Sequence, residues 1–303
     1  MTLAIAIHGG AGVVSRDISD QVRQEYIEGL STALRKGWEV LQSGGSAVDA
    51  VEASVESLEG RGSVFTSSGT HEMDASIMDG NGLRCGAIGG VSTVRNPIRL
   101  ARKVMDNSPH VFFAAAGAEA FAREQGFDIT PVEHFYTKHR HDQLQDAKRR
   151  QTVELSESEL KGKEVSNYNK GTVGAVALDS RGNLAAATST GGMTNKKAGR
   201  IGDSPIIGAG TYAANGVAAV SATGLGEQFI RHAVSHSIIA AMDYGKMTLR
   251  EACDDVVHKR LNEGDGGVIA LNAEGEVYMP YNSEGMFRAS ITSNSNEVVK
   301  IWE

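Results

Sequence analysis

The stretch Lys170–Pro205, KGTVGAVALDSRGNLAAATSTGGMTNKKAGRIGDSP, decides the fold of this chain. Its residues 172–179, TVGAVALD, are a short run of small and apolar residues, which is typical of a buried strand. SRGN then supplies turn residues, and LAAATST at 184–190 predicts a second strand that returns beside the first. Residues 138–169 are charged and polar with no sustained apolar period, so we expect a polar linker over about 138–171.

The Gly171–Thr172 step at the start of the hairpin has a chemical interpretation. A cut between the two residues would give Thr172 a free α-amine beside its own hydroxyl. That amine, with an ordinary pKa of about 7.7–8.0, would be a general base within reach of a poor nucleophile. Glycine before the cut tolerates strained backbone angles. A loop that simply ends in glycine before an ordinary strand remains the alternative, and Gly-Thr alone does not separate the two.

The glycine-rich loop after the hairpin carries Arg200 and Asp203, three residues apart in GRIGD. On a surface the two would form an ion pair of little energetic consequence. Beside a nucleophile they would complement each other, because a guanidinium matches a carboxylate and an aspartate accepts from an ammonium group. The pair therefore indicates a site for a free amino-acid end, with its carboxylate and ammonium groups.

The segment TGLGE at 223–227 lies between a predicted strand of small residues at 217–222 and a predicted helix at 228–243. Here the Thr223 hydroxyl and the Gly224 N–H would converge on a developing oxyanion. As a dinucleotide fingerprint, GLGEQF is a weak match in the wrong context. On the following helix His232 and His236 are four residues apart but lack an obvious third metal ligand, so packing or surface positions are favoured.

The composition excludes several classes of function. A net charge of −7 argues against nucleic-acid or membrane-surface binding, because both require basic patches. Two cysteines, Cys85 and Cys253, are too few for a disulfide framework or a thiolate metal site. No signal-like segment opens the chain, and no apolar run approaches the length of a membrane span. We therefore expect a cytoplasmic protein without a cofactor.

The remaining chain predicts helices and strands in alternating groups. We expect helices over 20–42, 97–105, 111–125, 228–243 and 248–261, and a further helix that begins after an N-cap at Ser46. Two strands are expected within 71–94. Groups of strands combined with packed pairs of helices are typical of an α+β layered fold in one domain, 1–303.

Several long motifs in this order resemble the plant-type asparaginase and isoaspartyl-peptidase family of N-terminal-nucleophile hydrolases. The motifs are IHGGAG at 7–12, HEMDASIMDG at 71–80, KGTVGAVALD at 170–179, GNLAAATSTGGMTNK at 182–196, GRIGDSPIIGAGTYA at 199–213, TGLGE at 223–227 and NSEGMFRA at 282–289. The resemblance covers nearly the whole chain, and it is far more specific than any single short pattern.

The resemblance implies a four-layer αββα sandwich and a chain that cuts itself at Gly171–Thr172. The products would be an α subunit, 1–171, and a β subunit, 172–303, assembled as a dimer of αβ units. Thr172 would be the nucleophile that cleaves the side-chain amide of L-asparagine or a β-aspartyl dipeptide. The resemblance further implies that Thr190 holds the nucleophile, and that Gly226 lines the substrate site with Arg200, Asp203 and Gly224.

Two positions depart from the family. Leu58-Glu59 runs directly into Gly60-Arg61-Gly62, so the short loop whose carbonyls surround a sodium ion in relatives is absent. We therefore expect no metal site of that form, and weakened self-cleavage or activity. Leu225 stands where relatives often carry a polar residue, which leaves the substrate preference open.

Two alternative functions remain open. A related hydrolase of the same class would act on glycosylated asparagine, but the missing secretory signal disfavours it. A catalytically silent member of the family would serve as a binding or structural protein, and the absent loop is its only support.

Overall fold

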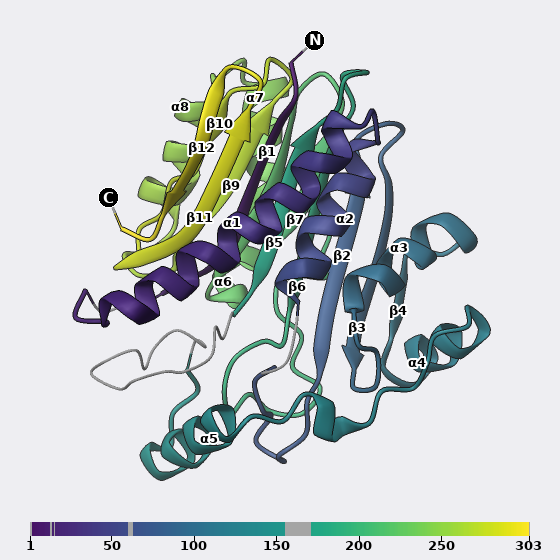
Figure 1. The fold of residues 1–303 in the computed structure, drawn as a ribbon, viewed down its shortest axis with the longest axis vertical. Coiled ribbons are helices and arrows are strands. Elements are labelled where there is room, and N and C mark those ends of the chain that lie inside the picture. Colours follow the sequence, from purple (N-terminus) through teal and green to yellow (C-terminus); the bar gives the residue numbers. More distant parts are fainter. Residues whose placement is uncertain (1, 13, 15, 60–62, 155–170, 303) are drawn as a thin grey trace.

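The computed structural model describes residues 2–12, 14, 16–59, 63–154 and 171–302. Its elements alternate between groups of strands and groups of helices, as the sequence predicts for an α+β protein (Figure 1). Among the described residues, none of the helices combines the length and the apolar character needed to cross a membrane.

Eight strands form the larger of two sheets, in the order β12-β11-β1-β5-β6-β2-β3-β4. Its strands are β1 (Ala4–Gly12), β2 (Met73–Asp79), β3 (Arg84–Val91), β4 (Phe112–Ala114), β5 (Val173–Leu178), β6 (Leu184–Thr190), β11 (Gly285–Thr292) and β12 (Ser295–Lys300). The hairpin predicted from the 170–205 stretch is thus the centre of this sheet, where β5 and β6 pair antiparallel.

Four strands form the smaller sheet, in the order β10-β9-β8-β7. They are β7 (Thr211–Ala214), β8 (Ala218–Gly224), β9 (Gly266–Asn272) and β10 (Val277–Tyr278). This sheet packs on one face of the larger sheet through apolar side chains that include Val176, Leu184 and Leu271.

Helices cover the outer faces of both sheets. The larger sheet packs against α1 (Asp20–Gln42), α2 (Ala47–Leu58), α3 (Pro97–Asn107) and α4 (Ala115–Glu124). The smaller sheet packs against α6 (Gly226–Arg231), α7 (Val234–Asp243), α8 (Leu249–Asp254) and the π-helical turn η2 (Asp255–Arg260). In Figure 1, α1 and α2 cross one face of the large sheet while α7 and α8 lie beyond the opposite side.

The strands near the centre of the large sheet are buried on both faces, and their residues alternate accordingly. In β1, Ile5 and Ile7 pack under the helices, whereas Ala4 and Ala6 face the small sheet. His8 continues the second series, so its side chain enters the space between the sheets, where it contacts Ser221 of β8. This alternation places polar groups inside the molecule near one end of the sheets.

The predicted linker is wrong over its first part. Residues Lys138–Arg150 form helix α5, with Thr137 as its N-cap and Gln151 in the left-handed conformation at its end. Its buried positions have helical spacing, but Arg140 and Gln143 occupy two of them beside Leu144 and Ala147. Because polar residues occupy the buried face, the sequence of this helix lacks the apolar periodicity from which helices are predicted. Residues 155–170, the rest of the predicted linker, lie outside the described part.

Three predicted helices differ in detail. The segment 111–125 begins with the short strand β4 before α4. The helix expected over 228–243 is divided into α6 and α7 at Ala233, whose φ of 44° is left-handed. The helix over 248–261 changes to a π-helical turn after Asp254. The helix Asp20–Gln42, the Ser46 cap of α2 and the two strands within 71–94 are confirmed.

Candidate active site

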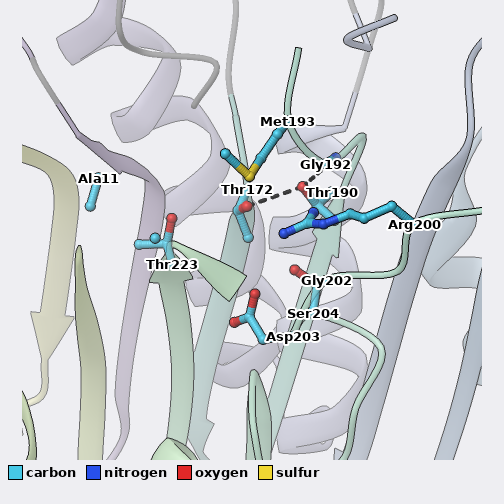
Figure 2. Close-up of a pocket in the computed structure, with 11 residues that line it drawn as sticks. Ala11, Thr172, Thr190, Gly192, Met193, Arg200, Gly202, Asp203, Ser204 and Thr223 are labelled. Carbon is cyan, nitrogen blue, oxygen red and sulfur yellow. Dashed lines mark hydrogen bonds between the residues drawn. The ribbon is translucent and has the colours of Figure 1, made fainter. Parts of the chain in front are cut away.

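Thr172 lies immediately before β5, beside the end of β6. Antiparallel pairing of the two strands puts Thr172 opposite Thr190, and their hydroxyl oxygens are 3.0 Å apart (Figure 2). The N–H of Gly192 donates to Thr190 Oγ1 at 2.9 Å, which fixes one acceptor site of that oxygen. The structure therefore brings the predicted nucleophile and its predicted partner into direct contact.

A cavity opens in front of Thr172. Its lining consists of Ala11, Thr172, Thr190, Gly192, Met193, Arg200, Gly202, Asp203, Ser204, Thr223 and Gly224. Every predicted site residue except Gly171 and Gly226 is in this set, although the residues come from segments that are far apart in the sequence. In Figure 2 the guanidinium of Arg200 and the carboxylate of Asp203 both lie on the cavity side of Thr172 and Thr190.

Gly226 is not among the cavity-lining residues, but it lies against two of them, Asp203 and Arg200. A Cβ at this position would lie 2.9 Å from Asp203 Oδ1 and 3.0 Å from Arg200 Nη2. A side chain here would therefore press on both residues. Gly224 has a φ of +150°, and a Cβ there would overlap the backbone of Asp265, so glycine is required at this position as well.

Asp203 is buried, and its Oδ2 has no hydrogen-bond partner among the described residues. Burial raises the pKa of this carboxyl to about 7, while its own backbone N–H and Arg200 act weakly in the opposite direction. An unpaired acceptor of this kind, directed into a cavity, is suited to receive a cationic group of a ligand.

Arg200 is held by Glu227, which the sequence analysis did not single out. Its Nε and Nη2 donate to the two carboxylate oxygens of Glu227 at 2.9 and 2.8 Å. This two-point contact orients the guanidinium of Arg200, which lines the cavity. Glu227 stands four residues after Thr223 in TGLGE, and only the fold places it against GRIGD.

The sequence analysis also missed Ala11, Gly192, Met193, Gly202 and Ser204 of the lining. Four of the five lie within three residues of a predicted residue in the motifs STGGM and GRIGDSP, which is the signal that would have found them. Met193 is buried and lines the cavity together with Thr172. A second ion pair, Asp74 with Lys196, is fully buried close to this cavity, with 3.9 Å between Oδ2 and Nζ.

Metal ligands were not expected, and the described residues contain no cluster of three or more His, Cys, Asp or Glu that could hold a metal ion. The expected absence of a sodium site concerns the chain around Gly60–Gly62. These residues lie outside the described part, so that expectation stays a prediction.

The raised pKa of Asp203 has a consequence for stability. A folded pKa of about 7 against an ordinary 3.8 means that the folded protein binds the proton more tightly. The stabilisation from this proton is complete below pH ~4 and is lost as the pH rises through 7. Asp203→Asn, which needs no proton, should therefore unfold less readily than the parent at pH 8, by on the order of 2–4 kcal/mol.

Urea unfolding at pH 8 and pH 4, with both proteins in a Thr172→Ala background, would measure this difference. The background keeps the chain in one covalent state. The two proteins should be nearly equal in stability at pH 4. An Asp203→Asn protein that is less stable at pH 8 would contradict the assignment of a costly buried carboxylate.

The chain belongs to the asparaginase family, whose model matches residues 1–301. It is 50% identical to the isoaspartyl peptidase of Escherichia coli (strain K12), over 94% of this chain and 91% of the relative. It is 44% identical to the probable isoaspartyl peptidase/L-asparaginase 2 of Arabidopsis thaliana, over 99% of both chains. The isoaspartyl peptidase/L-asparaginase of Homo sapiens is 40% identical, over 94% of this chain and 92% of the relative.

Proposed function

We propose that this protein is a self-processing amidohydrolase that cleaves the side-chain amide of L-asparagine and the β-aspartyl bond of isoaspartyl dipeptides. The observation that carries the proposal is the contact between Thr172 and Thr190 at the cavity that Arg200 and Asp203 line. The names of relatives that are 40–50% identical over most of the chain point to the same reaction.

In the precursor, the Thr172 hydroxyl attacks the carbonyl carbon of Gly171. The bond between that carbon and the Thr172 nitrogen breaks, so that residues 1–171 become an ester on Thr172 Oγ1. Water hydrolyses the ester and releases the α subunit, 1–171, and the β subunit, 172–303. Thr172 then carries the free α-amine that acts as the base for its own hydroxyl.

In the mature enzyme, Thr172 Oγ1 attacks the side-chain carbonyl of the substrate. Arg200 holds the substrate α-carboxylate and Asp203 accepts from its α-ammonium, with Gly226 leaving room for both. The Thr223 hydroxyl and the Gly224 N–H stabilise the tetrahedral oxyanion. Ammonia or an amino acid leaves, and water hydrolyses the β-aspartyl ester. Thr190, in contact with Thr172, keeps the hydroxyl oriented.

The proposed architecture is the four-layer αββα sandwich of the N-terminal-nucleophile hydrolases, in one domain. Its support is that helices pack on the outer face of each sheet while apolar residues join the two inner faces. The proposed assembly is a dimer of αβ units. Large apolar side chains that are 40–56% exposed support an interface on the segment that follows β3: Val111, Phe112, Ile129, Val132 and Tyr136.

Intact mass of the purified protein under denaturing conditions tests self-cleavage. We expect two fragments, the smaller of which begins Thr172-Val173-Gly174 by N-terminal sequencing. A single uncut chain after long incubation would favour the catalytically silent alternative and point to the absent loop before Gly60. The same sample under native conditions should give the mass of two αβ units.

A further inference from the structure

A polar layer lies in the otherwise apolar space between the two sheets. Along β5 it is at the level of Gly174, two residues after Thr172. The larger sheet contributes three of its side chains and the smaller sheet two. The polar layer consists of His8, Ser76, Thr188, Thr211 and Ser221, all of them fully buried.

The register of the strands aligns these residues. His8 pairs with Gly174, Gly174 with Thr188, and Thr188 with Ser76, so that they occupy one level across β1, β5, β6 and β2. Two positions nearer the cavity are Thr172, immediately before β5, and Thr190 of β6, which are opposite each other and in contact. The polar layer therefore lies directly behind the nucleophile.

Side-chain contacts join the layer into one chain. They run from His8 Nε2 to Ser221 Oγ (2.9 Å), to Thr188 Oγ1 (2.7 Å), to Thr211 Oγ1 (2.6 Å), to Ser76 Oγ (2.8 Å), and finally to the carbonyl oxygen of Ser204 (2.6 Å). Ser204 follows Asp203 and lines the cavity. The chain thus connects the space behind Thr172 to the loop that carries the proposed substrate-binding carboxylate.

His8 is a neutral ring that is hydrogen-bonded to a hydroxyl group. Each of the four hydroxyl groups has one proton, and the Ser204 carbonyl can only accept. The hydroxyls of Thr188 and Ser221 also reach carbonyl oxygens, those of Gly210 (3.0 Å) and Ala187 (3.2 Å). The hydrogen bond between His8 Nε2 and Ser221 Oγ can have either atom as its donor, depending on the tautomer of the ring. Burial lowers the pKa of His8 to about 3, with the Thr172 backbone acting weakly against it, so the ring is neutral.

Gly174 makes room for the imidazole. A Cβ at this position would overlap His8 Nε2 and Ser221 Oγ, so β5 has no side chain of its own behind Thr172. The ring also approaches the backbone of Thr172. His8, a residue of the other proposed subunit, fills the place that a side chain of β5 would otherwise take.

We propose that His8, held through Nε2 by the polar layer, is a positioning residue for Thr172. This inference rests on the proposed function, because it concerns the efficiency of the Thr172 nucleophile. His8 contacts no substrate and transfers no proton. It fixes the start of β5, and a displacement of a nucleophile by about 1 Å lowers turnover by about a hundredfold.

Two replacements of His8 separate its hydrogen bond from its volume. Gln can place an amide nitrogen or oxygen near the position of Nε2 and keep a hydrogen bond to Ser221, whereas Met has a similar size and makes no such hydrogen bond. We expect His8→Met to lower kcat and the rate of self-cleavage at least about tenfold, with KM within about twofold of the parent. His8→Gln should recover most of the loss. Because the ring is neutral, the loss should be the same from pH 5.5 to 8.5.

Ser221→Ala removes the same hydrogen bond from the other side and leaves His8 intact. Its matched control is Ser54→Ala, which removes a buried hydroxyl that donates to the Ala33 carbonyl between α1 and α2. Both variants should lose thermal stability, but only Ser221→Ala should lose kcat, by about tenfold.

The outcomes separate the two proposals. A parent protein that neither cuts itself nor hydrolyses a β-aspartyl dipeptide overturns the proposed function and this inference with it. An active parent, with His8→Met and Ser221→Ala both retaining kcat within about twofold, overturns this inference alone. Equal losses in His8→Gln and His8→Met would also overturn it, because the hydrogen bond at Nε2 would then have no role.

Discussion

Replacing Thr172 with alanine should leave a single uncut chain and reduce hydrolysis of β-aspartyl dipeptides by more than about 10⁴-fold in kcat. The size of the effect follows from the proposed double use of one hydroxyl, which attacks Gly171 in the precursor and the substrate in the mature enzyme. Removing the nucleophile of a covalent hydrolase leaves only the contribution of binding and oxyanion stabilisation. Denaturing electrophoresis and a direct assay of released amino acid would measure both effects.

Thr172→Ser is the matched control, since it retains the hydroxyl and loses only the methyl group. It should still be cut, more slowly, because the serine side chain is less restricted in its rotamers than threonine. Turnover by Thr172→Ala within about tenfold of the parent would refute Thr172 as the nucleophile. So would cleavage of Thr172→Ala at the same bond.

Replacing Thr223 with valine should lower kcat by about 10²–10³-fold and change KM little. Valine nearly matches threonine in shape, so the nearly buried site at the end of β8 should remain packed. The lost hydroxyl is the side-chain donor that we assign to the oxyanion, whose charge develops only in the transition state. Loss of one such donor has an effect of this size in other hydrolases. Steady-state kinetics with a β-aspartyl dipeptide would measure it.

Thr194→Val provides the comparison for Thr223→Val. Thr194 is also buried, and its hydroxyl has no hydrogen-bond partner among the described residues. It is not among the cavity-lining residues, and its replacement should leave kcat unchanged. If Thr223→Val kept kcat within about threefold of the parent, the oxyanion would have to be stabilised by other groups.

The contact of Thr172 with Thr190 follows from local sequence. SRGN closes a short turn between β5 and β6, and that turn fixes which residues of the two strands are opposite each other. The pairing of a cation and an anion at Arg200 and Asp203 could likewise be predicted, because both residues lie in the five-residue motif GRIGD. Such features need only short-range geometry, so the sequence predicts them well.

Features that depend on distant segments could not be predicted in this way. Glu227 meets Arg200 only because α6 begins beside the GRIGD loop. The alignment of His8 with Thr188 requires β1 to pair with β5 and β5 to pair with β6. In the sequence, about 160 residues separate the end of β1 from the start of β5. Helix α5 was missed because Arg140 and Gln143 are on its buried face. The break between α6 and α7 was missed because Ala233, and not a glycine, adopts the left-handed conformation there.

The strand order has a consequence for the two proposed subunits. Residues 1–171 would supply β1, β2, β3 and β4, and residues 172–303 would supply β5, β6, β11 and β12. In the sheet, β1 lies between β11 and β5, so both of its neighbours would belong to the other polypeptide. The cut would therefore leave every ladder of the sheet intact while dividing its strands between two chains. If the two chains were expressed from separate genes, each would have strands with unpaired backbone N–H and C=O groups at their edges. Only pairing with the strands of the other chain would satisfy these groups.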